Sequence, residues 1–179
     1  MFISSVRYLC GTYILTEDEH FGSFLFEVSF YTIIRTLSLK SSNLLREISE
    51  LLQSGDLVPD ELNKDNLYWF GYKNFKDELI AIMGMEQYGN ICLLRSLTVK
   101  VEERKNGLAD KLIKEVTDFA VNAKCVEAYL ITSTVVDKMR KHGFESIDRT
   151  ELPEAIKKSK FFIEICPLSS VVMNKNLSC

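Results

Sequence analysis

Three common signals are missing from this chain of 179 residues. Its five cysteines contain no Cys-x-x-Cys pair, and its two histidines, His20 and His142, are far apart, so neither a disulfide framework nor a structural zinc site is indicated. No apolar run approaches the length of a membrane span. We therefore expect no metal and no membrane partner, and scattered free cysteines favour a reducing cytoplasm.

An excess of positive charge is also missing. The formal net charge is −3 and the isoelectric point is about 5.5, which argues against nucleic acid or an anionic membrane as a partner. The N-terminus has only Arg7 as a basic region and lacks a small-residue cleavage site, so we expect no signal peptide. A hydrophobic content of 46% suits one globular domain with a full core.

The most informative segment runs from Ile91 to Ala123. An apolar, β-prone run ends at Val99, a charged turn follows, and from Gly107 onwards apolar residues recur at helical spacing. The segment therefore predicts a strand, a tight loop and a helix. Unpaired N–H groups at the start of a helix, together with its dipole, attract phosphate. The pattern matches neither the Walker loop nor the dinucleotide-binding fingerprint.

The rest of the chain alternates strand and helix signals. We expect strands at 32–35, 67–72, 78–85, 126–132, 144–147 and 171–173, and helices following Ser41–Asn43 and at 59–66, 134–141 and 154–165. In the first helix, Leu44, Leu45, Ile48, Leu51 and Leu52 share one face, and Gly55 suits the C′ position. This order predicts an α+β or α/β fold with one mixed central sheet flanked by helices.

The N-terminal residues are harder to interpret. Short β-prone pieces at 13–15 and 24–28 indicate either an extra hairpin or a poorly ordered extension, and we favour the extension. We divide the chain into an extension at 1–30 and a main domain at 31–179.

The pattern Arg104-x-x-Gly107-x-Ala109 resembles the Arg/Gln-x-x-Gly-x-Gly/Ala signature of the GNAT superfamily of N-acetyltransferases. The resemblance extends through 84–89, 93–99, 152–156 and 166–173 to the N-acetyltransferases encoded in bacterial arsenic-resistance operons. The C-terminal part is distantly similar to amino-acid N-acetyltransferases such as N-acetylglutamate synthase. The resemblance as a whole extends over residues 31–177.

The resemblance implies the GNAT acyl-CoA N-acyltransferase fold, with three layers and acetyl-CoA as acetyl donor. It implies that backbone groups at Leu97, Thr98 and Val99 bind the pantetheine arm. Backbone N–H groups of the loop would bind the pyrophosphate: Arg104, Lys105, Asn106, Gly107, Leu108, Ala109 and Asp110.

The activity implied is acetylation of the amine of a small amino-acid-like molecule, with a role in arsenic or antimetabolite resistance. Two alternatives are a non-catalytic acetyl-CoA-binding module and a protein N-acetyltransferase. Either a monomer or a homodimer is consistent with the sequence.

Four residues bear on the chemistry. Glu86 ends an apolar strand and is our candidate general base and a substrate contact, with a solvated carboxylate as the alternative. Arg95 lies in an otherwise apolar strand, so it either pairs with an internal acid such as Glu86 or binds an acceptor carboxylate, the role we favour. Many relatives place a proton-donating tyrosine where this chain has Met139. Cys166, before Pro167, is the cysteine of most interest.

Overall fold

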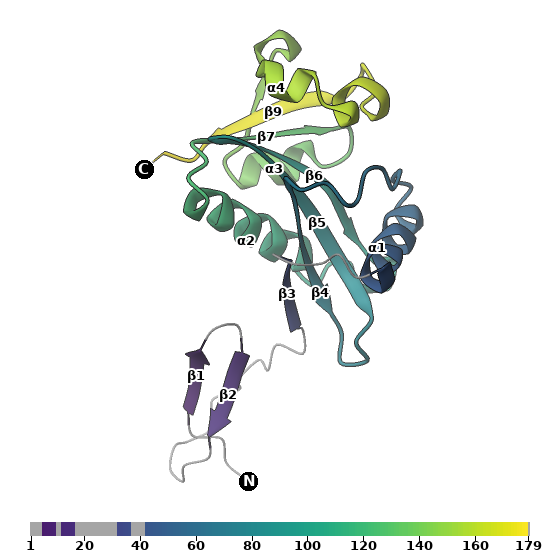
Figure 1. The fold of residues 1–179 in the computed structure, drawn as a ribbon, viewed down its shortest axis with the longest axis vertical. Coiled ribbons are helices and arrows are strands. Elements are labelled where there is room, and N and C mark those ends of the chain that lie inside the picture. Colours follow the sequence, from purple (N-terminus) through teal and green to yellow (C-terminus); the bar gives the residue numbers. More distant parts are fainter. Residues whose placement is uncertain (1–4, 10–11, 17–31, 37–41, 179) are drawn as a thin grey trace.

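The computed structural model describes residues 5–9, 12–16, 32–36 and 42–178 (Figure 1). One seven-stranded sheet has the order β3-β4-β5-β6-β7-β9-β8. Each of its strands lies where the sequence predicts one: β3 (Thr32–Thr36), β4 (Leu67–Lys73), β5 (Leu79–Tyr88), β6 (Ile91–Val99), β7 (Glu127–Thr132), β8 (Glu145–Ile147) and β9 (Val171–Asn176). Only the β6–β7 pair is parallel among these strands, so the predicted mixed sheet is confirmed.

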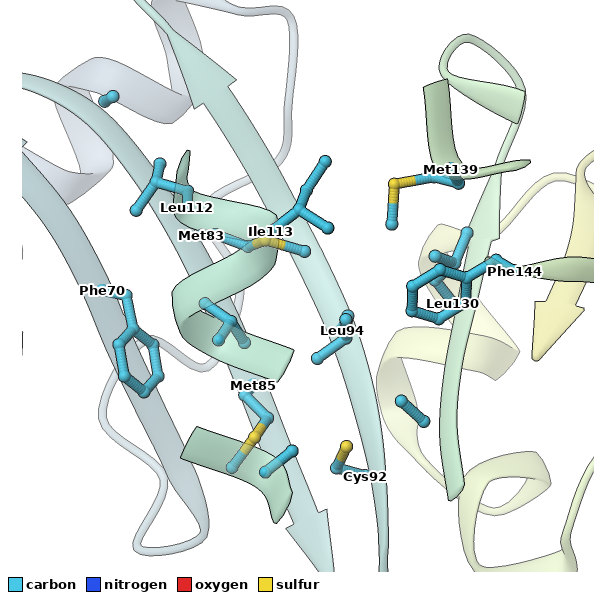
Figure 2. Packing of buried hydrophobic residues seen from close by; sticks show 14 of the residues in the cluster. Phe70, Met83, Met85, Cys92, Leu94, Leu112, Ile113, Leu130, Met139 and Phe144 are labelled. Atoms are coloured by element: carbon cyan, nitrogen blue, oxygen red, sulfur yellow. The ribbon is translucent and has the colours of Figure 1, made fainter. Parts of the chain in front are cut away.

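The helices α1 (Ser42–Ser54) and α2 (Leu108–Asn122) cover opposite faces of this sheet. Residues of α1 pack with Trp69 and Ile82, whereas residues of α2 pack with Phe70 and Met83, in the cluster that Figure 2 shows. Because consecutive strand residues point to opposite faces, these neighbouring pairs place the helices on either side.

The second half of the sheet is covered in the same way. The helix α3 (Val136–Lys141) joins the α2 side through Met139, and α4 (Glu154–Lys157) packs through Ile156 in a cluster with Leu93. Three layers result. Short 3-10 turns, η1 (Val101–Glu103) and η2 (Arg149–Glu151), complete the connections.

The strand β6 contains one extra residue relative to β5. Gly84 pairs with Arg95 and Ile82 with Thr98, so a two-residue step on β5 matches a three-residue step on β6. Between them Ser96 adopts a φ of 59°, a conformation typical of a bulge. Because paired residues point to the same face, Arg95 and Thr98 both project with Ile82 towards the α1 side.

The short helix predicted at 59–66 is wrong. This segment is described throughout and forms turns. Glu61 has a φ of 43°, outside the right-handed helical region, and the carbonyl oxygen of Asp60 accepts a hydrogen bond from Arg95 at 2.7 Å. A tertiary contact therefore uses a backbone group that a helix would have used.

The helix predicted at 154–165 is interrupted. It divides into α4 and the π-helical turn η3 (Phe161–Ile165). Between the two, Ser159 donates its hydroxyl to the carbonyl oxygen of Ile156 at 2.7 Å, the kind of side-chain contact that competes with helix continuation.

The prediction that Gly55 is the C′ residue of α1 is also wrong. The left-handed residue is Asp56, with a φ of 58°. The N–H of Leu57 donates to the carbonyl oxygen of Leu52 at 3.0 Å, and the N–H of Asp56 donates to that of Gln53 at 3.1 Å, which is a Schellman cap shifted by one residue.

Residues 5–16 contain a hairpin. Strands β1 (Ser5–Leu9) and β2 (Thr12–Thr16) pair antiparallel in a separate two-stranded sheet. The β-prone piece at 13–15 lies within β2, and the choice between a hairpin and an extension for residues 1–30 stays a prediction. The β-prone piece at 24–28 lies outside the described residues.

Among the residues that the structure describes, no helix is long and apolar enough to cross a membrane. The same residues contain no group of three or more histidine, cysteine, aspartate or glutamate side chains that could hold a metal ion.

Candidate functional site

A cleft of about 890 Å³ opens between β6 and β7. These strands pair in parallel as far as Leu94 and Leu130, and no ladder joins them beyond that point. Both strands continue, β6 to Val99 and β7 to Thr132, so the sheet opens between them. On this side the last residues of β6 have no strand partner among the described strands, and an extended ligand can hydrogen-bond to such an edge.

The predicted phosphate loop lies at one end of the cleft. Gly107 is the N-cap residue of α2, with a φ of 74°, and no atom lies within 4 Å of the place a Cβ would take. A ligand can therefore approach the backbone closely. No side chain caps this helix, so its first N–H groups and its dipole are directed at the cleft.

Most residues that the resemblance assigns to the cofactor line this cleft. Asn106 does not line it; its amide lies 3.5 Å from a carboxylate oxygen of Glu103. The residues that do are Leu97, Thr98, Val99, Arg104, Lys105, Gly107, Leu108, Ala109 and Asp110.

Asp110 places an acidic group in the first turn of α2, where it would oppose a phosphate. Its carboxylate accepts hydrogen bonds from Lys138 at 2.8 and 2.9 Å and contacts His142 at 2.8 Å. The Lys138 hydrogen bond, followed by that of His142, lowers the pKa of Asp110 below its usual value. Lys138 also lines the cleft, so the acid is neutralised by a cation at the same site.

Arg95 lies towards the other end of the cleft, with its side chain fully buried. Its Nη1 donates to Glu86 at 2.5 Å, and its Nη2 donates to the carbonyl oxygen of Asp60 at 2.7 Å. The ring of Phe161 stacks 4.7 Å from the guanidinium carbon. The internal ion pair, one of the two alternatives for Arg95, is therefore present.

Glu86 is fully buried and does not line the cleft. One carboxylate oxygen pairs with Arg95; the other accepts a hydrogen bond from Tyr88 and lies 3.7 Å from the Lys64 ammonium. Burial, followed by this hydrogen bond, raises the pKa of Tyr88, so its hydroxyl stays protonated. The solvated carboxylate that we considered is wrong.

The expected proton donor of the cleft is absent at residue 139. Met139 is buried in the core next to Leu130 and Phe144 (Figure 2), and it lines the cleft with its thioether, which carries no proton. Cys166 also lines the cleft, and burial raises its pKa to about 11 although the charges of Arg149 and Arg95 oppose the shift.

The two remaining described cysteines, Cys92 and Cys125, are buried. Burial raises the pKa of both thiols. Cys92 lies in β6 as predicted, whereas the strand position predicted for Cys125 is wrong, because β7 begins only at Glu127.

The geometry fits one kind of cofactor. A helix start open to phosphate and a strand edge open to an extended arm share one cleft, as a thioester of coenzyme A requires. The fold and the site thus define a coenzyme A-dependent acyltransferase.

The sequence matches the profile of the Acetyltransferase (GNAT) family over residues 36–147, and the chain belongs to this family. No curated protein matches the sequence significantly. As a family member, the protein is an acetyl-CoA-dependent N-acetyltransferase, and acetyl-CoA supplies the acetyl group as a thioester.

Solved structures share the fold at low identity. A GNAT-family acetyltransferase from Staphylococcus aureus Mu50 is 18% identical with a TM-score of 0.66, covering 83% of this chain and 99% of its own. N-acetylglutamate synthase from Neisseria gonorrhoeae, solved with coenzyme A and L-arginine, is 14% identical with a TM-score of 0.65, covering 84% of this chain and 34% of its own. An aminoglycoside 6′-N-acetyltransferase complexed with coenzyme A is 16% identical with a TM-score of 0.62, covering 82% of this chain and 97% of its own.

Sequence reasoning missed several groups that the fold brings to the site. Lys138 and His142, which both contact Asp110, are four residues apart. This spacing was a usable signal that the two side chains share one face of a helix. The stacking of Phe161 on Arg95 had none, because the two residues are far apart in sequence.

Proposed function

We propose that the protein transfers acetyl to the amine of a small amino-acid-like acceptor that carries a carboxylate. The supporting observation is that Arg95 lines the same cleft as the phosphate loop. A guanidinium has five N–H donors, and the contacts to Glu86, the Asp60 carbonyl and Ser96 use three of them. Two donors are left for an acceptor carboxylate.

Phe161 stacks on the guanidinium and the Arg95 side chain is fully buried, so an acceptor has to displace this ring to reach these donors. The fully buried state of the Arg95 side chain makes the interaction strong once formed, because a charge-assisted hydrogen bond gains strength away from water.

Glu86 remains our candidate general base for the acceptor ammonium. Its position behind Arg95 also gives it a second role, to orient the guanidinium and offset its buried charge. The two roles differ in their consequences. Losing a base lowers kcat, whereas losing the anchor lowers stability and raises the acceptor KM.

For the donor, we propose that the backbone of Leu97, Thr98 and Val99 binds the pantetheine arm. The loop from Arg104 to Asp110 would hold the pyrophosphate. The open β6 edge and the uncapped start of α2 support this assignment. The neutralisation of Asp110 by Lys138 supports it too, because it removes a repulsive charge.

We propose that residues 31–179 form the acetyltransferase domain, preceded by an extension at 1–30. A role in arsenic or antimetabolite resistance, cytoplasmic location and a monomeric or homodimeric state remain expectations from the sequence resemblance and composition.

The decisive experiment measures thiol release from acetyl-CoA with a panel of amines. The panel contains free amino acids, their arsenic- and phosphorus-containing analogues, decarboxylated counterparts and peptides. We expect release with one class of free amino acid and little with its decarboxylated counterpart. Equal rates with both would contradict the role of Arg95, and release confined to peptides would favour a protein N-acetyltransferase.

The second candidate is a non-catalytic acetyl-CoA-binding module. The observation that favours it is Met139, which places a thioether in the cleft where relatives use a proton donor. Calorimetric titration with acetyl-CoA separates the two candidates: binding without thiol release across the panel would select the module.

A further inference from the structure

Thr98 has a hydroxyl that the fold leaves unused. The residue is 5% exposed, and its Oγ1 has no hydrogen-bond partner among the described residues. Buried hydroxyls are normally paired, because losing water without gaining a partner is costly. Thr98 nevertheless lines the cleft, so a ligand in the cleft is the available partner.

The hydroxyl faces the side of the sheet opposite the phosphate loop. Leu97 and Val99 pack on the α2 side, where that loop begins the helix. Thr98 pairs with Ile82, a residue of the α1 side, and shares that face with Arg95 through the bulge. Acetyl-CoA that binds at the N-terminus of α2 therefore lies on the opposite face from the Thr98 side chain, which can then contact the acceptor.

Gly55, in the turn after α1, packs closely against the Thr98 side chain. A Cβ on Gly55 would lie 2.7 Å from Cγ2 and 3.5 Å from Oγ1 of Thr98. Since its φ is not left-handed, the turn itself does not require glycine here. The requirement is close approach, and the next residues, Leu57 and Val58, add an apolar wall to the cleft.

We propose that Thr98 is a specificity-determining residue whose hydroxyl binds a polar group on the side chain of the acceptor. This deepens the proposed function and rests on it. Arg95 and Thr98 are three residues apart in β6 and project from the same face of the sheet. When the acceptor carboxylate binds Arg95, the rest of the acceptor therefore extends towards Thr98. A hydroxyl both donates and accepts, which favours acceptors with a hydroxyl or carboxamide side chain over apolar ones.

The test compares matched acceptors in wild-type enzyme, Thr98→Val and Thr98→Ser. The probes are serine with 2-aminobutyrate and glutamine with norleucine, together with the best acceptor of the amine panel. In wild type we expect the polar member of a pair to have the higher kcat/KM. Thr98→Val, which keeps the shape and removes the hydroxyl, should lower kcat/KM for that acceptor by roughly 5- to 20-fold and lower it less for the apolar member.

Two controls distinguish a loss of acceptor recognition from a loss of folded structure. Thr98→Ser keeps the hydroxyl and should keep the preference. Thr98→Val should unfold at the same or a higher urea midpoint, because it removes an unpaired buried group.

Equal kcat/KM of wild type and Thr98→Val for the best acceptor would overturn this role of Thr98 and leave the enzyme assignment standing. A lower urea midpoint for Thr98→Val, together with equal losses of kcat/KM for both acceptors of a pair, would also overturn this role of Thr98. Absence of thiol release from wild type across the panel, with acetyl-CoA bound, would overturn the proposed function and the Thr98 role with it.

Discussion

At the scale of single residues, Gly107 is the position where backbone conformation and charge matter most for the donor. Its φ of 74° favours glycine, and the space around its Cβ position is open to a ligand. We expect Gly107→Glu to remove measurable acetyl-CoA binding in calorimetry, because it places a carboxylate beside the proposed phosphate position. Gly107→Asn is the matched control, since asparagine tolerates the left-handed region and adds no charge. Similar affinity in both variants would refute the loop assignment.

The buried pair of Arg95 and Glu86 makes a second prediction at this scale. Arg95→Ala leaves the Glu86 carboxylate buried without its main partner, so we expect a loss of about 3–5 kcal/mol in the free energy of unfolding. The double variant Arg95→Met with Glu86→Gln should recover much of that loss, because it removes both charges. Urea unfolding measures both effects. A loss below about 1 kcal/mol in Arg95→Ala would mean that the pair contributes little to stability.

Variants of Glu86 distinguish its two proposed roles, general base and orienting partner of Arg95. If Glu86 is the general base, Glu86→Gln should lower kcat, with a smaller change in stability. A raised acceptor KM at unchanged kcat would assign Glu86 to orienting Arg95. Glu86→Asp is the control, because it keeps the charge and changes the reach.

At the scale of elements, the bulge in β6 decides which side chains face the acceptor. Ser96 holds a φ of 59°, which a β-branched residue tolerates poorly. We expect Ser96→Val to cost about 1–3 kcal/mol and to shift Arg95 and Thr98, whereas Ser96→Gly should fold with nearly wild-type stability. Urea unfolding and the acceptor KM test both variants. Equal stability of Ser96→Val and wild type would show that the bulge is not strained.

At the scale of the whole molecule, the proposed division at residue 31 can be tested by truncation. The family match begins at residue 36, and β3, at the edge of the sheet, begins at Thr32. We expect a chain that starts at Tyr31 to keep the acetyl-CoA affinity and melting temperature of the full chain. A chain that starts at Leu37 lacks β3 and should lose stability, because β4 then exposes an unpaired edge. Loss of affinity on removing residues 1–30 alone would contradict the division.

Local patterns were enough for most of the fold. Apolar, β-prone runs located every strand of the main sheet, and the helix after Gly107 started where its glycine and apolar spacing predicted. Prediction failed where a side chain replaced a regular backbone contact. Arg95 takes the carbonyl of Asp60 from a would-be helix, and Ser159 interrupts the helix after Glu154.

The sequence by itself determined the family and the donor and predicted a phosphate loop, because these depend on a glycine, a helix start and an apolar strand that are contiguous in the chain. Only the tertiary structure decided the acceptor side. The bulge at Ser96 turns Arg95 and Thr98 to one face, Glu86 pairs with Arg95, and Gly55 packs closely against Thr98. These groups come from different elements, so their meeting depends on strand register and packing, which no local pattern encodes.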